Sequence, residues 1–452
     1  MPLNSLPTIT QQFESFDTGR GTSQPAWVRN YRKDAFAEFR ATGFPTARKN
    51  NELWKYTNVS PIASTEYKFP ATEANKILET ENYDLPCPRV YQIVFVDGKY
   101  APLLSSQPSR NVTDEAGVIT AYAENPIVGR LADGIENQNP LVKKSLGQPS
   151  SMEMKHFVAL NASFLDDGAF VYIPNNTHVA EPIYLLFIST GTGETASYPR
   201  TLVITGENSS ATVLQSFEGL GNQSYFTNAV TEVIAGQNSY LSLYNFQREN
   251  NLSSHVSSTY IEQYRGSQVD SISIDIGGHL TRRDIKSKLL EPDSKIKLYG
   301  LYYGSANQHI DNHTYVEHMV PYTSSEEVYK GILAQNSTGV FVGDVYVHPK
   351  AQKITANQIN KNILLSQSSK VYTQPKLQIF ADDVVCTHGA AVGQLDLDAI
   401  FYMKSRGINE LLAKQLLLKG FTSDILQAVI HDALRQYLEQ ATLNALGEEI
   451  YV

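Results

Sequence analysis

The stretch TLVITGENSSATVLQSFEG, residues 201–219, decides the fold, because its sequence pattern is repeated three more times later in the chain. Each copy is a short apolar run, a tight polar turn and a second apolar run. The turns at Gly206, Gly236 and Gly266 are evenly spaced, and the next turn, at Pro292, follows after a slightly shorter interval. A near-constant period of this size indicates stacked units that share one core. The later copies are TEVIAGQNSYLSLYNF from Thr231, YIEQYRGSQVDSISIDI from Tyr260 and KLLEPDSKIKLYGLYYG from Lys288.

The repeat predicts a mainly β protein built on a parallel β-helix. No helical pattern separates the apolar runs, so a doubly wound α/β sheet is disfavoured. A β-sandwich or barrel is the structural alternative, although neither needs a near-constant period. Alternation along the runs predicts which side chains point inward. These are Val269, Ile272, Ile274 and Ile276 in one unit, and Ile296, Leu298 and Leu301 in the next.

Helical patterns flank the repeat on both sides. Residues 1–150 are predicted as an N-terminal helical and mixed region, helical from Ala26 to about Tyr56 and with one clear strand at Val90–Val96. Residues 151–395 are the predicted β-helix core, and residues 396–452 a C-terminal helical domain. In that domain Asp396 and Asn409 are helix-starting residues, and Gly407 and Gly420 are stops. A longer segment from Ser423 carries one apolar stripe, made of Ile425, Val429, Leu434 and Leu438.

Composition narrows the function. The chain has 452 residues, of which 42% are hydrophobic and 18% charged, and a net charge of −9. This balance is typical of a strand-rich protein and argues against a nucleic-acid partner, which needs a basic face. The apolar runs are much shorter than the ~20 residues of a membrane span. Two cysteines, Cys87 and Cys386, cannot build a disulfide framework, so we expect a cytoplasmic protein.

The most informative candidate site is the pair Cys386 and His388. Residues at i and i+2 share one face of a strand, and thiolate and imidazole are both ligands that iron accepts. Two ligands do not complete a site, so others would have to come from elsewhere in the fold or from another subunit. The alternative is structural, with Cys386 packed as a small hydrophobe and His388 bonded to a turn.

Other titratable clusters are weaker candidates. On a strand, His309 and His313 would share a face and His318 would lie opposite, which favours satisfied polar groups on a β-helix wall over iron delivery. Adjacent carboxylates on a strand face opposite sides and make poor acid–base partners. Such pairs occur at Asp166–Asp167, Glu326–Glu327 and Asp382–Asp383. Three tyrosines, Tyr299, Tyr302 and Tyr303, are expected to stack as internal ladders, with a sugar-binding platform as the alternative.

No phosphate-binding loop, dinucleotide fingerprint, nucleophile elbow or H-E-x-x-H motif occurs in the sequence. A chain without a phosphate loop is not itself an ATPase, so any ATP-driven step needs a partner. A β-helix enzyme acting on polysaccharide is the competing hypothesis.

Six segments, in order along the chain, resemble the SufB/SufD family of iron–sulfur cluster assembly proteins. The resemblance is to its SufD branch in particular, because the SufB branch carries a different segment where this chain reads Cys386-Thr387-His388-Gly389. The matching segments are NELWKYT from Asn51, FVALNASFLDDG from Phe157, DNHTYVEH from Asp311, YKGILAQNSTGVFVGDVYV from Tyr329, AQKITANQINKNILLS from Ala351 and ADDVVCTHGAAVGQLDLDAIFYMKSRGI from Ala381.

The resemblance implies a right-handed parallel β-helix between helical regions, and a scaffold without turnover of its own. It implies a SufB-like subunit and a SufC-like ABC ATPase as partners, with a homodimer possible for the isolated chain. It places His388, with Cys386 as its less certain neighbour, at the SufB interface where a nascent iron–sulfur cluster forms. No cofactor is expected in the isolated chain. The basic residues Lys404, Arg406, Lys414 and Lys419 would face an acidic partner.

Overall fold

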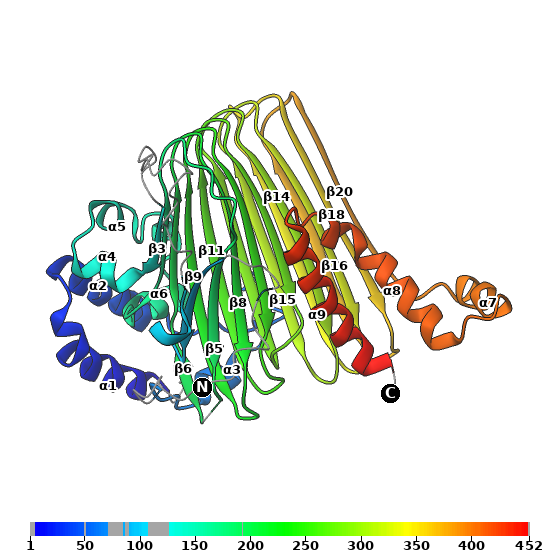
Figure 1. Ribbon diagram of the computed structural model, residues 1–452, viewed down its shortest axis with the longest axis horizontal. Helices are drawn as coiled ribbons and strands as arrows, with labels where there is room; N and C mark the ends of the chain where they lie inside the picture. The colour runs from blue at the N-terminus through cyan, green and yellow to red at the C-terminus, as the bar shows by residue number, and fades with distance from the viewer. Residues whose placement is uncertain are drawn as a thin grey trace, which may run out of the picture.

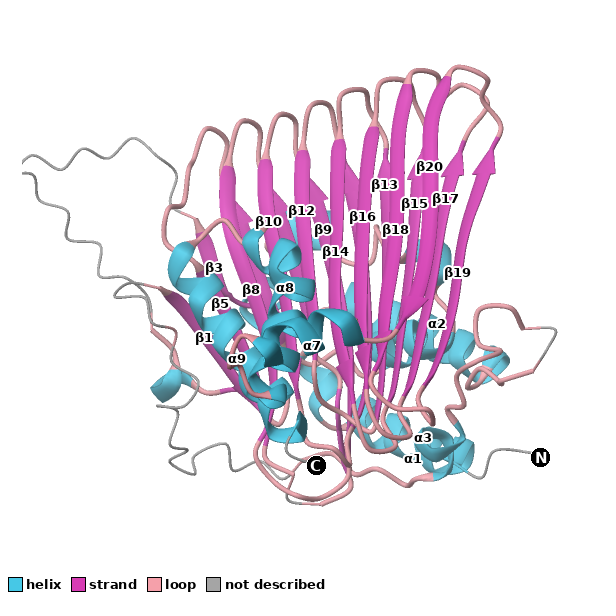
Figure 2. Ribbon diagram, turned by 90° about the vertical axis from the view of Figure 1, so that its right-hand side faces the viewer, coloured by secondary structure: helices cyan, strands magenta, loops and turns pink. Residues whose placement is uncertain are grey.

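Two long parallel sheets form the body of the molecule. The computed structural model describes residues 5–48, 51–70, 85, 90–106, 126–191 and 193–450. The sheets lie face to face over residues 168–393 and make a parallel β-solenoid, with helices at both flanks (Figures 1 and 2). Neighbouring core strands are parallel, which confirms the predicted β-helix and rules out an antiparallel sandwich or barrel.

Each coil of the solenoid contributes one strand to each sheet. Sheet B has the order β2 (Lys99–Tyr100), β1 (Tyr91–Val96), β5 (Ile183–Ser189), β8 (Ser210–Gly219), β10 (Tyr240–Arg248), β12 (Gln268–Asp275), β14 (Lys295–Gly304), β16 (Ser324–Leu333), β18 (Ile354–Leu364) and β20 (Val384–Gly393). Sheet A has the order β19 (Lys370–Ile379), β17 (Thr338–Val347), β15 (His309–His318), β13 (Leu280–Leu289), β11 (Ser254–Gln263), β9 (Tyr225–Ala235), β7 (Arg200–Thr205), β4 (Gly168–Ile173) and β3 (Ile127–Arg130), and β6 (Thr195–Ser197) pairs with β9.

The feature that recurs at the corner of each coil is a left-handed backbone conformation, and glycine is only one of the residues that adopt it. Tyr240 pairs with Ser210 and Gln268 pairs with Tyr240, so the second of these coils is slightly shorter than the first. Gly266 therefore lies next to Asn238, and not next to Gly236 as the even spacing of the glycines implied. Asn238 and Gly266 have φ values of 53° and 65°, a left-handed conformation that asparagine and glycine adopt at least cost.

Apolar side chains cover both faces of sheet B. The space between the sheets contains Val269, Ile296 and Leu298, as the alternation predicted. Four other residues predicted to point inward lie instead on the outer face of sheet B, beneath the C-terminal helices. They are Ile272, Ile274, Ile276 and Leu301. In β12 the inward positions after Val269 are the buried polar residues Ser271, Ser273 and Asp275, so the apolar alternation there marks the helix-covered face and not the lumen.

The C-terminal helices are α7 (Leu397–Ser405), α8 (Glu410–Gln427) and α9 (Asp432–Ile450). The predicted starts at Asp396 and Asn409 are confirmed, since both side chains accept hydrogen bonds from the first turn. Gly420 does not end a helix, because α8 continues through it, and the next helix begins at Asp432 and not near Ser423. Burial outweighs the helix cost of one glycine here. The predicted stripe, Ile425, Val429, Leu434 and Leu438, is 0–1% exposed.

The N-terminal helices cover the outer face of sheet A near its first coils, where α6 (His156–Ser163) and its neighbours pack on Phe226, Val256 and Leu280. The helix predicted from Ala26 ends at Thr42, before Gly43 at φ 59°, and residues 51–56 form turns instead of more helix. Cys87 lies outside the described residues. The helical elements are α1 (Ser5–Thr18), η1 (Arg20–Ser23), α2 (Ala26–Thr42), α3 (Ser60–Ser64), η3 (Pro102–Leu104), α4 (Leu131–Glu136), α5 (Pro140–Ser145), η4 (Ser151–Glu153) and α6 (His156–Ser163).

None of the described helices has the length and hydropathy of a bilayer span.

Candidate functional site

The two sheets end at β19 and β20, which we call the open end of the solenoid (Figure 2). Among the described strands, none pairs with their outer edges. Most side chains of β20 are exposed, whereas those of the inner strands are mostly buried. Apolar side chains are part of this exposed surface. They include Val385 (64% exposed), Val392, Tyr372, Ile379 and Phe380.

Cys386 and His388 both lie on β20 and point toward the space between the sheets. Cys386 pairs with Ala356 and His388 with Gln358, and both partners are buried inside the solenoid. Paired residues of a parallel ladder share a face, so the predicted common face of Cys386 and His388 is confirmed. Because no described coil covers β20, the inward direction here leads to the open end.

The two side chains differ in environment. Cys386 is half-buried against the last apolar cluster of the core, and burial raises the pKa of its thiol, partly opposed by a hydrogen bond from the backbone of Ala356. A neutral thiol is a weaker ligand than a thiolate, so the packing alternative retains its force for Cys386. His388 is exposed and has no hydrogen bond or ion pair within the described part of the chain, so it is not bonded to a turn.

Polar groups with unused bonding capacity form the floor below His388. Glu327 and Gln358 are 0% exposed, and Gln358 Nε2 donates to Glu327 Oε2 at 3.2 Å. Thr314 Oγ1, from sheet A, donates to the same oxygen at 2.6 Å. Gln358 Oε1 and Glu327 Oε1 are buried without a partner. Burial raises the pKa of Glu327 to about 7.

The described residues contain no group of three or more His, Cys, Asp or Glu side chains placed to hold a metal ion. Cys386 and His388 are donors of the type that iron–sulfur chemistry uses, but they are only two. An iron-containing substrate at the open end would therefore need ligands that this part of the chain does not bring together.

Strand β19 has a proline, Pro375, at a position whose backbone nitrogen faces the open edge of sheet A. Lys370 N donates to Ser337 and Phe380 N to Val347, both in or beside β17. Alternate residues of a parallel strand bond to the same neighbour, so even-numbered N–H groups face β17 and odd-numbered groups face the open edge. Pro375 has an odd number and no N–H, which interrupts the row of donors that a further strand would meet.

Residues 51–57, part of the first segment that resembles the family, form a strap across the outer face of sheet A. The Arg282 guanidinium lies 3.6 Å from the ring centre of Trp54, and Tyr56 stacks on Tyr372 of the edge strand β19 at 4.5 Å. Thr57 donates to Asp311 and lies 2.9 Å from His309 Nε2. The strap thus ties the N-terminal region to the open end.

The three histidines of β15 have structural partners. His309 contacts Thr57, and His313 Nε2 lies 2.9 Å from Asp311 Oδ1 on the same outer face. His318 points inward and contacts Thr323 and Ser325. The predicted faces are confirmed, and each histidine has a polar partner, as the structural interpretation expects.

The tyrosine prediction was partly wrong. Tyr302 lies inside the solenoid, where its hydroxyl donates to Asn362, whereas Tyr299 and Tyr303 lie on the outer face of sheet B.

The adjacent carboxylates do not form catalytic pairs. Glu326 and Glu327 lie on opposite faces of β16, as predicted. Asp382 and Asp383 lie in a turn and not on a strand, and Asp383 pairs with Lys353. This arrangement gives no support to the polysaccharide-cleaving alternative, which needs two carboxylates facing one groove.

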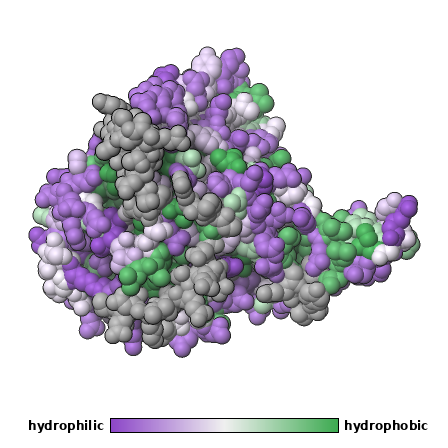
Figure 3. All heavy atoms as spheres, viewed as in Figure 1, coloured by the Kyte–Doolittle hydropathy of each residue, from purple (hydrophilic) through white to green (hydrophobic). Residues whose placement is uncertain are grey.

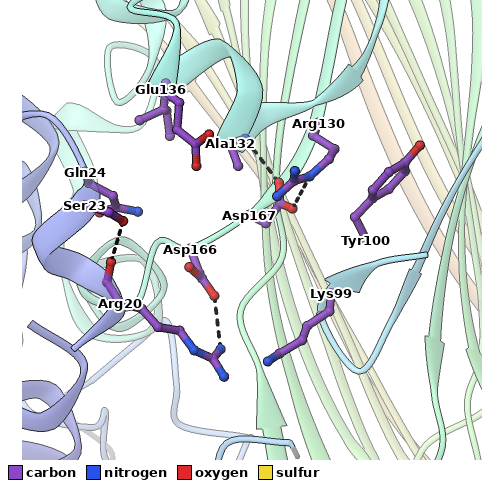
Figure 4. A pocket seen from close by; sticks show the side chains of 12 residues that line it. Arg20, Ser23, Gln24, Lys99, Tyr100, Arg130, Ala132, Glu136, Asp166 and Asp167 are labelled. Atoms are coloured by element: carbon purple, nitrogen blue, oxygen red, sulfur yellow. Dashed lines mark hydrogen bonds and ion pairs between the residues drawn. The ribbon is translucent and has the colours of Figure 1, made fainter. Parts of the chain in front are cut away.

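The remaining pair of adjacent carboxylates, Asp166 and Asp167, lies beside a hollow of about 350 Å³ between η1, β2 and α4 (Figure 4). Arg130 Nε donates to Asp167 at 2.9 Å, and Arg20 Nη1 to Asp166 at 3.4 Å. Burial raises the pKa of Asp167 to about 6, while Arg130 opposes that rise. Each carboxylate is therefore held by an arginine.

Sequence reasoning missed Glu327 and Gln358 as parts of the site. A signal existed, because Gln358 precedes His388 by one full repeat, and Glu327 precedes Gln358 by one more. Residues one period apart in a solenoid are stacked neighbours.

Comparison with known proteins gives matches over nearly the whole chain. The family model described as "SUF system FeS cluster assembly, SufBD core domain" matches residues 187–421, and the model "SufBD protein N-terminal region" matches residues 9–185. An iron–sulfur cluster assembly SufBD family protein of Synechocystis sp. is 29% identical over 87% of this chain and 86% of its own length. The iron–sulfur cluster assembly protein SufD of Escherichia coli is 28% identical, with 87% and 88% covered, and SufD of Bacillus subtilis is 23% identical, with 97% and 98% covered.

Proposed function

This chain belongs to the SufBD family of SUF-system iron–sulfur cluster assembly proteins, and we propose that it is a non-catalytic scaffold subunit of the SufD type. In this proposal the open end pairs with a SufB-like subunit, and the C-terminal helices dock a SufC-like ABC ATPase. The nascent cluster is the cargo of the complex and forms beside His388.

The open end is the observation that carries the proposal. Two strand edges, exposed apolar side chains and an imidazole without a partner in the described chain lie together there. A partner solenoid would add strands to these edges and cover the apolar residues, because exposed edges and apolar patches of this kind are pairing surfaces. It would also bring the ligands that Cys386 and His388 lack. Because Pro375 has no N–H, it favours a partner strand that can pair with β19 without a backbone hydrogen bond at this position.

A second exposed surface supports ATPase docking. Helix α7 projects away from the solenoid, and hydrophobic residues gather on the projecting arm (Figures 1 and 3). Its Leu397 and Phe401 are 73% and 74% exposed. Three of the predicted basic residues are already paired with carboxylates of this chain, Lys404 and Lys414 with Glu410 and Lys419 with Glu439. The proposed docking is therefore mainly apolar and less dependent on charge than the sequence suggested.

The main test is the His388→Ala variant in a complex reconstituted with SufB-like and SufC-like partners. Since the imidazole is exposed and unbonded, the variant should fold and assemble normally. The rate of cluster formation, followed by the visible absorbance of the cluster, should fall at least about tenfold. His178→Ala is the matched control, because His178 is also exposed but belongs to a corner beside Ser210. A parental rate for His388→Ala would refute the site.

The partner assignment is tested separately by purification from cell extract. The proposal expects an ABC ATPase and a sister solenoid to co-purify, and the chain alone to hydrolyse no ATP. Phe401→Asp should remove the ATPase and leave the sister solenoid bound. Cleavage of an acidic polysaccharide by the purified chain would favour the enzyme alternative instead.

A further inference from the structure

Three polar residues form a row along the inside of sheet B at the open end. Glu327 of β16 pairs with Gln358 of β18, and Gln358 pairs with His388 of β20. Neighbouring strands are about 4.8 Å apart, so paired side chains on one face lie directly over one another. The row starts in the fully buried core and ends at the exposed imidazole.

The hydrogen bonds of the row are incomplete at two atoms, Glu327 Oε1 in the core and Gln358 Oε1 next to His388. The Gln358 amide is oriented by its Nε2 bond to Glu327 Oε2, which also accepts from Thr314. Its other atom, Oε1, is buried without a partner although Gln358 is 0% exposed. Leaving a buried carbonyl oxygen unpaired is costly, so such an atom signals a missing donor. The next residue in the row, His388, can supply an N–H and has no other partner in the described chain.

We propose that Gln358 is the positioning residue for His388. Its Oε1 accepts one imidazole N–H, which selects a single tautomer and fixes the plane of the ring. The second nitrogen then presents its lone pair to the open end, as a ligand for iron requires. Histidine ligands generally donate their other N–H to a fixed oxygen in this way. Glu327 and Thr314 act one step further back, because they fix which end of the Gln358 amide faces His388.

This inference rests on the proposed function for the use made of His388, but the bond itself can be measured on the isolated chain. Imidazole ¹⁵N NMR of histidine-labelled protein distinguishes the two neutral tautomers. The spectrum is taken at about pH 8.5, two units above an ordinary histidine pKa. The His388 signals are those lost in His388→Asn.

The Gln358→Met variant keeps the length of the side chain but removes the acceptor. The His388 tautomer ratio should then move about fivefold toward that of free histidine, because one ordinary hydrogen bond is lost. Gln374→Met is the matched control, since Gln374 lies on β19 and faces away from the lumen. It should leave the ratio unchanged. Exchanging the two side chains, Glu327→Gln together with Gln358→Glu, retains an acceptor at position 358 and should restore the parental ratio.

An unchanged ratio in Gln358→Met would overturn the inference, and so would an equal shift in Gln374→Met. If Gln358→Met does not fold, Gln358→Asn decides, because its amide is one methylene too short to reach both neighbours. These outcomes are independent of cluster formation. A normal tautomer shift with full assembly by His388→Ala would refute the proposed function alone.

Discussion

One end of the solenoid is covered by further strands and the other is not. At the N-terminal end, β2 and β3 run antiparallel to β1 and β4, and every residue of β1 is buried. At the C-terminal end, β19 and β20 have no covering strand among the described residues, and most of β20 is exposed. The same structural unit is core where it is covered and exposed surface where it is not, and we propose that this exposed surface binds the partner. A substitution should therefore change stability in the covered coils and partner binding at the open end.

The largest contrast is expected between two ion pairs. Asp275 and Arg283 lie inside the solenoid, 2.6 Å apart and 1% exposed, whereas Lys353 and Asp383 are more than half exposed in a turn at the open end. Asp275→Asn leaves a buried charge unpaired and should lower the free energy of unfolding by about 3–5 kcal/mol. Asp383→Asn should change it by about 0.5 kcal/mol or less. Urea unfolding of both variants measures the difference, and equal losses would contradict it.

The pH dependence of stability should come partly from Glu327, the fully buried end of the row formed by Glu327, Gln358 and His388. Burial raises the pKa of Glu327 from 4.5 to about 7, so the folded chain holds a proton that the unfolded chain releases between these values. Its contribution to stability is complete below about pH 4.5 and is lost as the pH rises through 7. Between pH 5 and 8, Glu327→Gln should gain about 2–3 kcal/mol relative to the parental chain. A constant difference between the two unfolding curves would show that Glu327 does not titrate there.

Two inward-facing valines compare the covered and open coils directly. Val269 is 0% exposed on β12, and Val392 is 48% exposed on β20. Val269→Ala should cost about 2 kcal/mol, from the lost burial and the cavity that remains. Val392→Ala should cost about 0.5 kcal/mol or less in the isolated chain. If both cost the same, the open end is covered in solution by something other than solvent.

The smallest effect is on binding alone. Val385 is 64% exposed on the edge strand β20, so Val385→Lys should leave unfolding unchanged within about 0.5 kcal/mol. A charge on an edge opposes strand pairing. Affinity for the sister solenoid should therefore fall about tenfold, which is about 1.4 kcal/mol. Titration calorimetry measures this, with Tyr264→Lys, on an exposed corner of an inner coil, as the control.

The sequence predicts the solenoid and the first two C-terminal helix starts well because those signals are local. A polar corner in every coil and a side-chain cap at Asp396 or Asn409 depend on a few neighbouring residues. The facing of Ile272 and Ile274 was wrong because it depends on α8 and α9, which return to cover sheet B from far along the chain.

The same distinction applies to the site. The shared face of Cys386 and His388 follows from their spacing, and the structure agrees. The repeat length suggests Gln358 as a neighbour of His388, but its bonds to Glu327 and to Thr314 of the opposite sheet could not be predicted, because they require the exact register between coils and between sheets. Local periodicity fixes the face of a residue, while tertiary register fixes its neighbours.

The antiparallel strands β2 and β3 have a consequence for stoichiometry. A solenoid with two open ends would be a monomer for polymerisation, since each added copy would expose a new edge and a filament could grow without limit. Here one end is finished by strands that run the wrong way to accept another parallel coil. In the proposed complex, growth through the open end would therefore stop at two solenoids, and the assembly would be a discrete particle instead of a fibre.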